Sequence, residues 1–126
     1  MGYYSTLIAQ EPVKTALTKE EFFERWEKAK ESLVGTEDEG YLDEYKWEVW
    51  KEEGGFTWYW LDMEEWYAKH YADEHLAKFI SEVIVDGEKS LLEFNGEDGI
   101  NWGYYITKGS VKEIEYVKMV DGKRIE

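Results

Sequence analysis

The chain of 126 residues is long enough for one domain with a single core, and 17% aromatic residues supply large side chains that argue against disorder. The absence of cysteine excludes a disulfide framework and a thiolate metal site. A formal net charge of −14 disfavours direct binding to nucleic acid, whose phosphates are also negative. We therefore expect residues 1–126 to form a single domain.

The N-terminal part predicts a strand followed by an amphipathic helix. Residues 3–9 form an uncharged, β-favouring run that Pro12 closes. Thr18 and Glu21 have the spacing of a capping box, and Gly35 can terminate the helix that follows. The apolar residues of this helix recur on one face, and they are Phe22, Trp26, Ala29 and Leu33.

The middle of the chain predicts a loop, a hairpin and a second helix. Residues 36–44 are acidic and read as an exposed loop, while residues 45–61 alternate as in a hairpin with a glycine-containing turn. One face of the second hairpin strand would carry Phe56, Trp58 and Trp60, and the other Thr57, Tyr59 and Leu61. Asp62 and Glu65 repeat the capping spacing and predict a helix through residue 80, which Asp73 can interrupt.

Three further strands are predicted at residues 89–95, 100–107 and 111–119. The first six elements then follow the βαββαβ order of ferredoxin-like folds. We expect an α+β fold with two helices on one face of a mainly antiparallel sheet that the C-terminal strands extend.

Two short motifs carry a resemblance. The opening Met1-Gly2-Tyr3-Tyr4-Ser5 and the later Phe94-Asn95-Gly96-Glu97-Asp98 are similar to motifs of small uncharacterised phage and bacterial proteins. Those proteins begin Met-Gly-Tyr-x-Ser and have a Gly-Glu-Asp turn after a late strand, although Tyr4 stands where they commonly have arginine. The resemblance implies a small α+β protein encoded by a virus or mobile element, and it transfers no catalytic residue.

The acidity and the tryptophans coincide in one segment. Nineteen acidic and five basic residues between positions 36 and 98 give it a charge of −14, and five of the seven tryptophans lie in positions 47–66. A field of one sign and aromatic anchors are typical of recognition surfaces. The expected partner-binding residues are Glu37, Asp38, Glu39, Asp43, Glu44, Trp50, Tyr59, Asp62 and Glu65.

We interpret the chain as a non-enzymatic interaction protein that binds a basic protein. A viral or mobile-element inhibitor of a nucleic-acid-handling or defence protein fits this pattern, with carboxylates that mimic the phosphates of nucleic acid. No leader-like or membrane-spanning run is present in the sequence, so we expect a cytoplasmic protein, in the host cytoplasm if viral, as a monomer or homodimer without a cofactor.

Three alternatives remain open from the sequence. The acidic segment can serve only solubility, and the hairpin aromatics can be core residues. If the aromatics are partly exposed, they can instead line a pocket for a ring or nucleotide-like compound. A metal-assisted hydrolase is the third alternative, although no metal-binding motif is present and His70 is predicted to be a packed structural imidazole. Its candidate ligands are Glu64, Glu65, His70, Asp73, Glu74 and His75.

Overall fold

The computed structural model describes residues 3–63, 66–116, 118–120 and 123–125. These described residues form two α-helices, a five-stranded and a three-stranded antiparallel sheet, and a separate antiparallel pair of strands, which is an α+β fold, as expected. The elements are β1 (Ser5–Gln10), β2 (Val13–Thr15), α1 (Lys19–Glu31), the short 3-10 helix η1 (Tyr41–Glu44), β3 (Trp47–Glu53), β4 (Phe56–Leu61), β5 (Tyr67–Ala68), α2 (Asp73–Val83), β6 (Lys89–Gly96), β7 (Asn101–Thr107), β8 (Ser110–Glu113), β9 (Lys118–Val120) and β10 (Lys123–Ile125).

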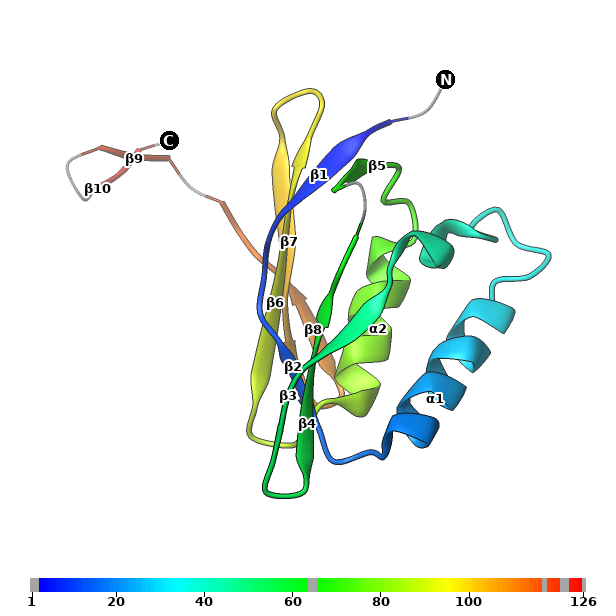
Figure 1. The fold of residues 1–126 in the computed structure, drawn as a ribbon. Coiled ribbons are helices and arrows are strands. Elements are labelled where there is room, and N and C mark those ends of the chain that lie inside the picture. Colours follow the sequence, from blue (N-terminus) through cyan, green and yellow to red (C-terminus); the bar gives the residue numbers. More distant parts are fainter. Residues whose placement is uncertain (1–2, 64–65, 117, 121–122, 126) are drawn as a thin grey trace.

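The strands are divided among sheets. One sheet has the order β5-β1-β6-β7-β8, a second has the order β2-β4-β3, and β9 pairs with β10. Figure 1 shows α1 and α2 on one side of the strands. The hairpin β3-β4 thus pairs with β2 in a sheet of its own, whereas the predicted order placed it in one sheet with the strands that follow α2.

The five-stranded and the three-stranded sheet are joined where β1 passes into β2. Pro12, which has no N–H for a strand ladder, lies between these strands. Two residues before Pro12, the side-chain amide of Gln10 forms the two hydrogen bonds with the backbone of Leu61 that a paired strand would otherwise form. Its Nε2 donates to Leu61 O and its Oε1 accepts from Leu61 N, both at 2.9 Å. The end of β4 is therefore fixed to the five-stranded sheet.

Helix α1 forms as its sequence predicts and supplies half of an aromatic core. Thr18 and Glu21 make the reciprocal capping-box hydrogen bonds. Phe22 is fully buried and stacks on Tyr59 of β4 with ring centroids 3.8 Å apart, and Trp26 packs edge-on against Trp47. The helix ends at Glu31, four residues before Gly35, and Leu33 is buried in the turn that follows.

The second helix is shorter than predicted, because α2 begins at Asp73 and the expected start at Asp62 is wrong. Part of the intervening segment forms β5, which pairs with β1. Leu7 N of β1 also donates to Trp66 O at 3.1 Å. Backbone groups along this edge of β1 therefore gain partners, a long-range requirement that outweighs a local capping pattern.

The described parts of the two short motifs, residues 3–5 and 94–98, lie side by side. Ser5 pairs with Gly96, and Tyr3 Oη donates to Asp98 Oδ1 at 2.5 Å. A Cβ atom on Gly96 would stand 1.6 Å from Tyr3 Oη, so glycine gives the tyrosine room to reach the turn. Among the described residues, no helix is long and apolar enough to cross a membrane.

Candidate cation-binding site

Asp73, the first residue of α2, is a buried carboxylate held by two aromatic side chains of β7. Its Oδ2 accepts hydrogen bonds from Trp102 Nε1 at 2.7 Å and from Tyr104 Oη at 2.8 Å. A buried carboxylate requires such donors, because its desolvation is costly without them. The positive end of the helix dipole also favours an acidic residue in the first turn. These contacts fix the start of α2 against β7.

The strand period explains why these aromatic groups meet α2. Trp102 and Tyr104 are two residues apart on β7 and therefore share the face that looks toward the helix. Phe94 of β6 stacks on Trp102 with an interplanar angle of 13° and ring centroids 5.4 Å apart. Tyr104 lies opposite Glu113 in the pairing of β7 with β8, which places a second carboxylate beside the first.

A cavity of about 320 Å³ opens beside Asp73. Its walls include the carboxylates of Asp73, Glu74 and Glu113 and the rings of Trp102 and Tyr104. Among the described residues that line this cavity, none is basic. Its volume lies at the lower end of the range for small-ligand sites, which suits a single side chain or a small molecule.

The electrostatic field in the cavity is negative. Burial raises the pKa of Tyr104 far above its ordinary value, and the charges of Asp73, Glu74 and Glu113 raise it further. Nearby negative charges have this effect because they disfavour a phenolate. The same field attracts a cation.

The residue types in this cavity are those that recognise an ammonium or guanidinium group. Carboxylates accept charge-assisted hydrogen bonds from such a group, and the faces of tryptophan and tyrosine rings attract it. For the metal alternative, the described residues include no group of three or more His, Cys, Asp or Glu side chains that could hold a metal ion. Glu64 and Glu65 lie outside the described residues.

His70 is a structural imidazole. It is 4% exposed, and its ring packs against Phe94 with centroids 5.0 Å apart. Its Nε2 lies 3.0 Å from Trp66 O, and a carbonyl can only accept, so Nε2 carries the proton. Nδ1 then accepts from Tyr45 Oη at 2.6 Å. Both ring nitrogens are thus engaged, where one was expected, and burial lowers the pKa of His70.

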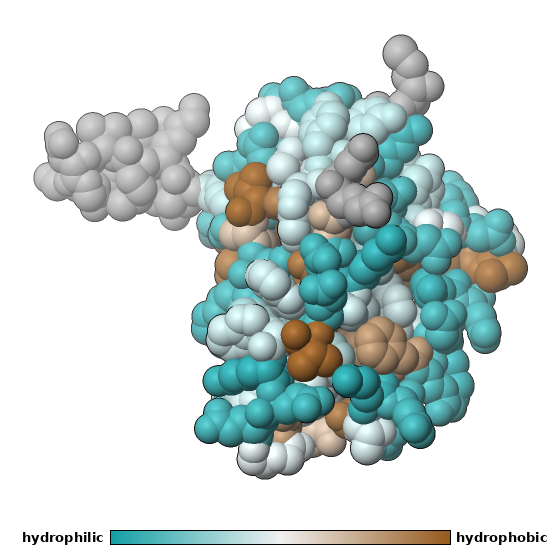
Figure 2. Space-filling view, in the orientation of Figure 1, coloured by the Kyte–Doolittle hydropathy of each residue, from teal (hydrophilic) through white to brown (hydrophobic). Residues whose placement is uncertain are grey.

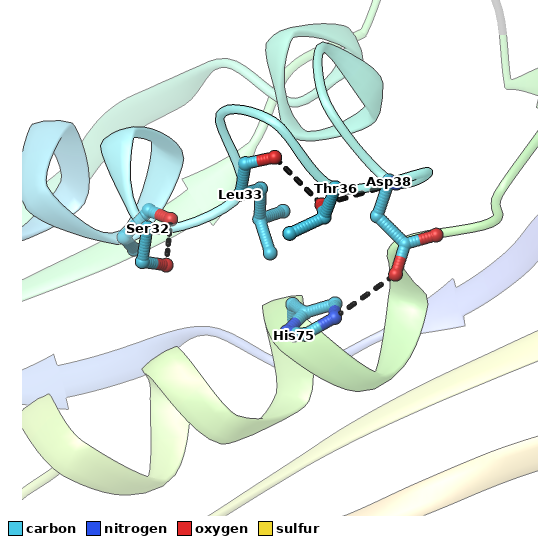
Figure 3. Close-up of polar contacts among 6 residues, drawn as sticks. Ser32, Leu33, Thr36, Asp38 and His75 are labelled. Atoms are coloured by element: carbon cyan, nitrogen blue, oxygen red, sulfur yellow. Dashed lines mark hydrogen bonds and ion pairs between the residues drawn. The ribbon is translucent and has the colours of Figure 1, made fainter.

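The acidic loop at residues 36–44 lies against the first turn of α2. Asp38 Oδ2 is 3.2 Å from His75 Nε2, and a dashed line in Figure 3 marks this contact. Glu39 accepts from Gly35 N at 2.9 Å, and Asp43 lies 3.5 Å from Lys30 Nζ. The segment is less loop-like than predicted, because Leu42 in η1 is buried. Three of the five expected acidic contacts in this loop therefore also have partners within the chain.

The hairpin exposes some aromatics and buries others. Trp50 is 52% exposed and remains a candidate contact, whereas Tyr59 is fully buried, so its expected place on an exposed face is wrong. Tyr59 takes its inward place because Phe22 stacks on it. On the outward side, the ammonium groups of Lys14 and Lys51 lie over the ring of Trp58 at 5.2 and 4.3 Å.

The outward hairpin face is therefore already occupied in part by the chain's own cations. The face drawn in Figure 2 is mostly hydrophilic, with hydrophobic residues in small separate groups. A flat stacking platform for a ring compound would have to displace the lysines from Trp58. This arrangement favours a polar recognition surface over a purely apolar one.

The remaining expected contacts lie elsewhere or are not described. Asp62 follows β4, and its N–H donates to Lys46 O at 2.8 Å. A hydrogen bond with Asp62, together with its charge, raises the pKa of Glu48, so these two carboxyl groups adjoin each other. Glu65 lies outside the described residues.

Sequence reasoning missed three members of the cavity, Trp102, Tyr104 and Glu113. In the sequence, Asp73 and Glu74 are candidate metal ligands, and Asp73 is also a residue that can interrupt the second helix. The available signal was the period-two spacing of Trp102 and Tyr104, which puts two polar-tipped aromatics on one strand face. What the sequence lacked was the pairing that sets this face against the start of α2.

Comparison of the chain with protein-family models, with curated proteins and with solved structures finds no match.

Proposed function

We propose that this protein binds a basic protein or peptide and takes one lysine or arginine side chain of that partner into the cavity beside Asp73. The observation that supports this most directly is the composition of the cavity. Three acidic and two aromatic residues line it, and no basic residue stands among its described lining residues. A partner's cation would supply the missing charge.

The surface beside the cavity extends the negative field. The Asp38–His75 contact holds the acidic loop against α2 two residues along the helix from Asp73, and Glu37 and Glu44 of this loop are exposed. A basic peptide that runs from Asp73 around the start of α2 would reach these carboxylates. Long-range attraction of this kind accelerates association and is screened by salt.

The test is a calorimetric titration with a hexa-arginine and a hexa-lysine peptide at low and at physiological salt. We expect saturable binding that the double variant Glu74→Gln/Glu113→Gln weakens about tenfold, because two charge-assisted hydrogen bonds are lost. The matched control is Glu20→Gln/Glu31→Gln, which removes the same charge from exposed positions on α1. It should change the affinity by less than about twofold at physiological salt.

Equal losses in the two double variants would show that only net charge attracts the peptide, and they would contradict a specific cavity. Absence of saturable binding would contradict the proposal altogether.

The sequence also predicts a more specific role, a viral or mobile-element inhibitor that mimics nucleic acid. This role remains a prediction. It requires a basic partner, as the cavity does, but no described contact bears on the identity of that partner. Capture of a nucleic-acid-handling protein that Glu74→Gln/Glu113→Gln fails to capture would support it.

A further inference from the structure

A cavity of about 510 Å³ lies between the two helices and is separate from the acidic one. Arg25 and Lys28 of α1 and His75 and Lys78 of α2 are among the side chains that line it. Its volume is in the range of small-molecule sites. The two helices thus contribute basic side chains to one groove.

This groove has the opposite charge sign to the rest of the molecule. Three permanent cations and one histidine line it against a single carboxylate, Glu82, whereas the chain as a whole has 29 acidic and 15 basic residues. An even distribution of charge would put about two acidic residues in the groove for each basic one. The groove is therefore a local positive region in a negative protein.

Lys28, one of the cations of the groove, forms a weak ion pair within the chain. Lys28 Nζ is 3.3 Å from Glu24 on the same helix, with both side chains about two thirds exposed or more, and such pairs are readily exchanged. Lys28 also lies in the last turn of α1, where a cation is favourable, but this explains neither Arg25 nor Lys78. His75 also lines the groove, and its ring meets Asp38 of the acidic loop.

We propose that the groove between α1 and α2 binds a small anion that carries two or more phosphate groups. Arg25 offers the planar fork that grips a phosphate, and Lys28 and Lys78 act as point charges on neighbouring phosphates. Cations on both helices favour a ligand whose negative charges are spread across the groove. The ligand would also offset the repulsion among these cations.

The experiment uses inorganic tripolyphosphate as the probe, titrated calorimetrically into the full chain at low salt. We expect saturable binding of one equivalent. The double variant Arg25→Gln/Lys78→Gln should weaken it about tenfold or more, because two charge-assisted contacts are removed. The control Lys19→Gln/Lys112→Gln makes the same change in net charge at exposed positions outside the groove, and it should leave the affinity within about twofold.

A second measurement follows the backbone amide signals of the wild-type protein by NMR, which requires no variant to fold. The signals of residues 25–32 and 75–82 should shift with tripolyphosphate, and those of β3 and β4 should not. Shifts confined to other elements, equal losses in the two double variants, or no saturable binding by the wild-type chain would overturn the proposal. The groove and the cavity beside Asp73 are separate sites. We therefore expect Glu74→Gln/Glu113→Gln to keep its binding of tripolyphosphate even where it loses binding of the cationic peptides.

Discussion

At the scale of single residues, Asp73 is the central residue of the candidate site. It joins α2 to β7 through two hydrogen bonds and faces the cavity at the same time. Its carboxylate is therefore both a structural acceptor and part of the proposed recognition surface. This double role makes its substitution costly, whereas its neighbour Glu74 is exposed.

We expect Asp73→Ala to lower the free energy of unfolding by about 2 to 4 kcal/mol, because Trp102 Nε1 and Tyr104 Oη would lose their acceptor. Glu74→Ala, one residue along the same helix, should cost less than about 1 kcal/mol. Urea unfolding of the two variants and the wild-type chain measures both. Equal costs would contradict the structural role assigned to Asp73.

His70 should make stability depend on pH. Its pKa is lowered by burial in the folded chain, whereas the unfolded chain takes up this proton near pH 6.5. The stability that the neutral imidazole contributes is therefore present above about pH 6.5. It is lost as the pH falls below that value toward the folded pKa, by up to about 1.4 kcal/mol per pH unit.

Urea unfolding between pH 8 and pH 5 tests this expectation. The wild-type chain should lose more stability over this range than His70→Gln, in which no group titrates at that position. His75 is common to both proteins and so serves as an internal control. Identical pH profiles would show that His70 is not the source of the dependence.

At the scale of elements, α1 and the hairpin hold each other through aromatic rings. Trp26 is 4% exposed and packs edge-on against both Trp47 and Phe79. We expect Trp26→Ala to cost about 3 to 5 kcal/mol through lost burial and the resulting cavity. Trp50→Ala, at an exposed hairpin position, should cost less than about 1 kcal/mol. Similar losses in denaturant unfolding would contradict this packing.

Tyr3, two residues before β1, contacts the turn between β6 and β7 through Asp98, and this contact leads to a further prediction. The hydrogen bond to Asp98 raises the pKa of Tyr3 to about 12 and lowers that of Asp98. Gly96→Ala would place a methyl group where Tyr3 Oη stands, and the flexible ring would swing away. We expect the pKa of Tyr3 to return toward its ordinary value near 10.

Carbon-13 NMR titration of labelled tyrosine rings measures this change, with Tyr3→Phe to assign the signal. A pKa that stays near 12 in Gly96→Ala would mean that Tyr3 and Asp98 keep their contact and that the glycine is not needed for it.

At the scale of the whole molecule, local patterns predicted local structure well. The capping box at Thr18 and the stripe led by Phe22 predicted α1, and Gly54 and Gly55 marked the hairpin turn. Patterns failed where a distant partner decided the outcome. The capping spacing at Asp62 did not produce a helix, because this segment instead supplies the edge of β1 with a partner.

The candidate site shows the same limit. Its residues come from α2, β7 and β8, and only their long-range packing brings them together. Charge by segment pointed to the acidic centre of the chain, which contains Asp73 and Glu74, but Trp102, Tyr104 and Glu113 lie beyond residue 98. No spacing in the sequence relates these three residues to Asp73.

The most direct test of the central claim is an NMR titration that follows the seven tryptophan indole N–H signals as a hexa-arginine peptide is added. Entry of an arginine side chain into the cavity should shift the Trp102 signal in a saturable manner, because that indole bonds Asp73 at the cavity wall. The signals of Trp50 and Trp60 on the hairpin should move little. A Trp102 signal that stays unchanged while the peptide binds, or shifts confined to the hairpin tryptophans, would contradict recognition of a basic partner at Asp73.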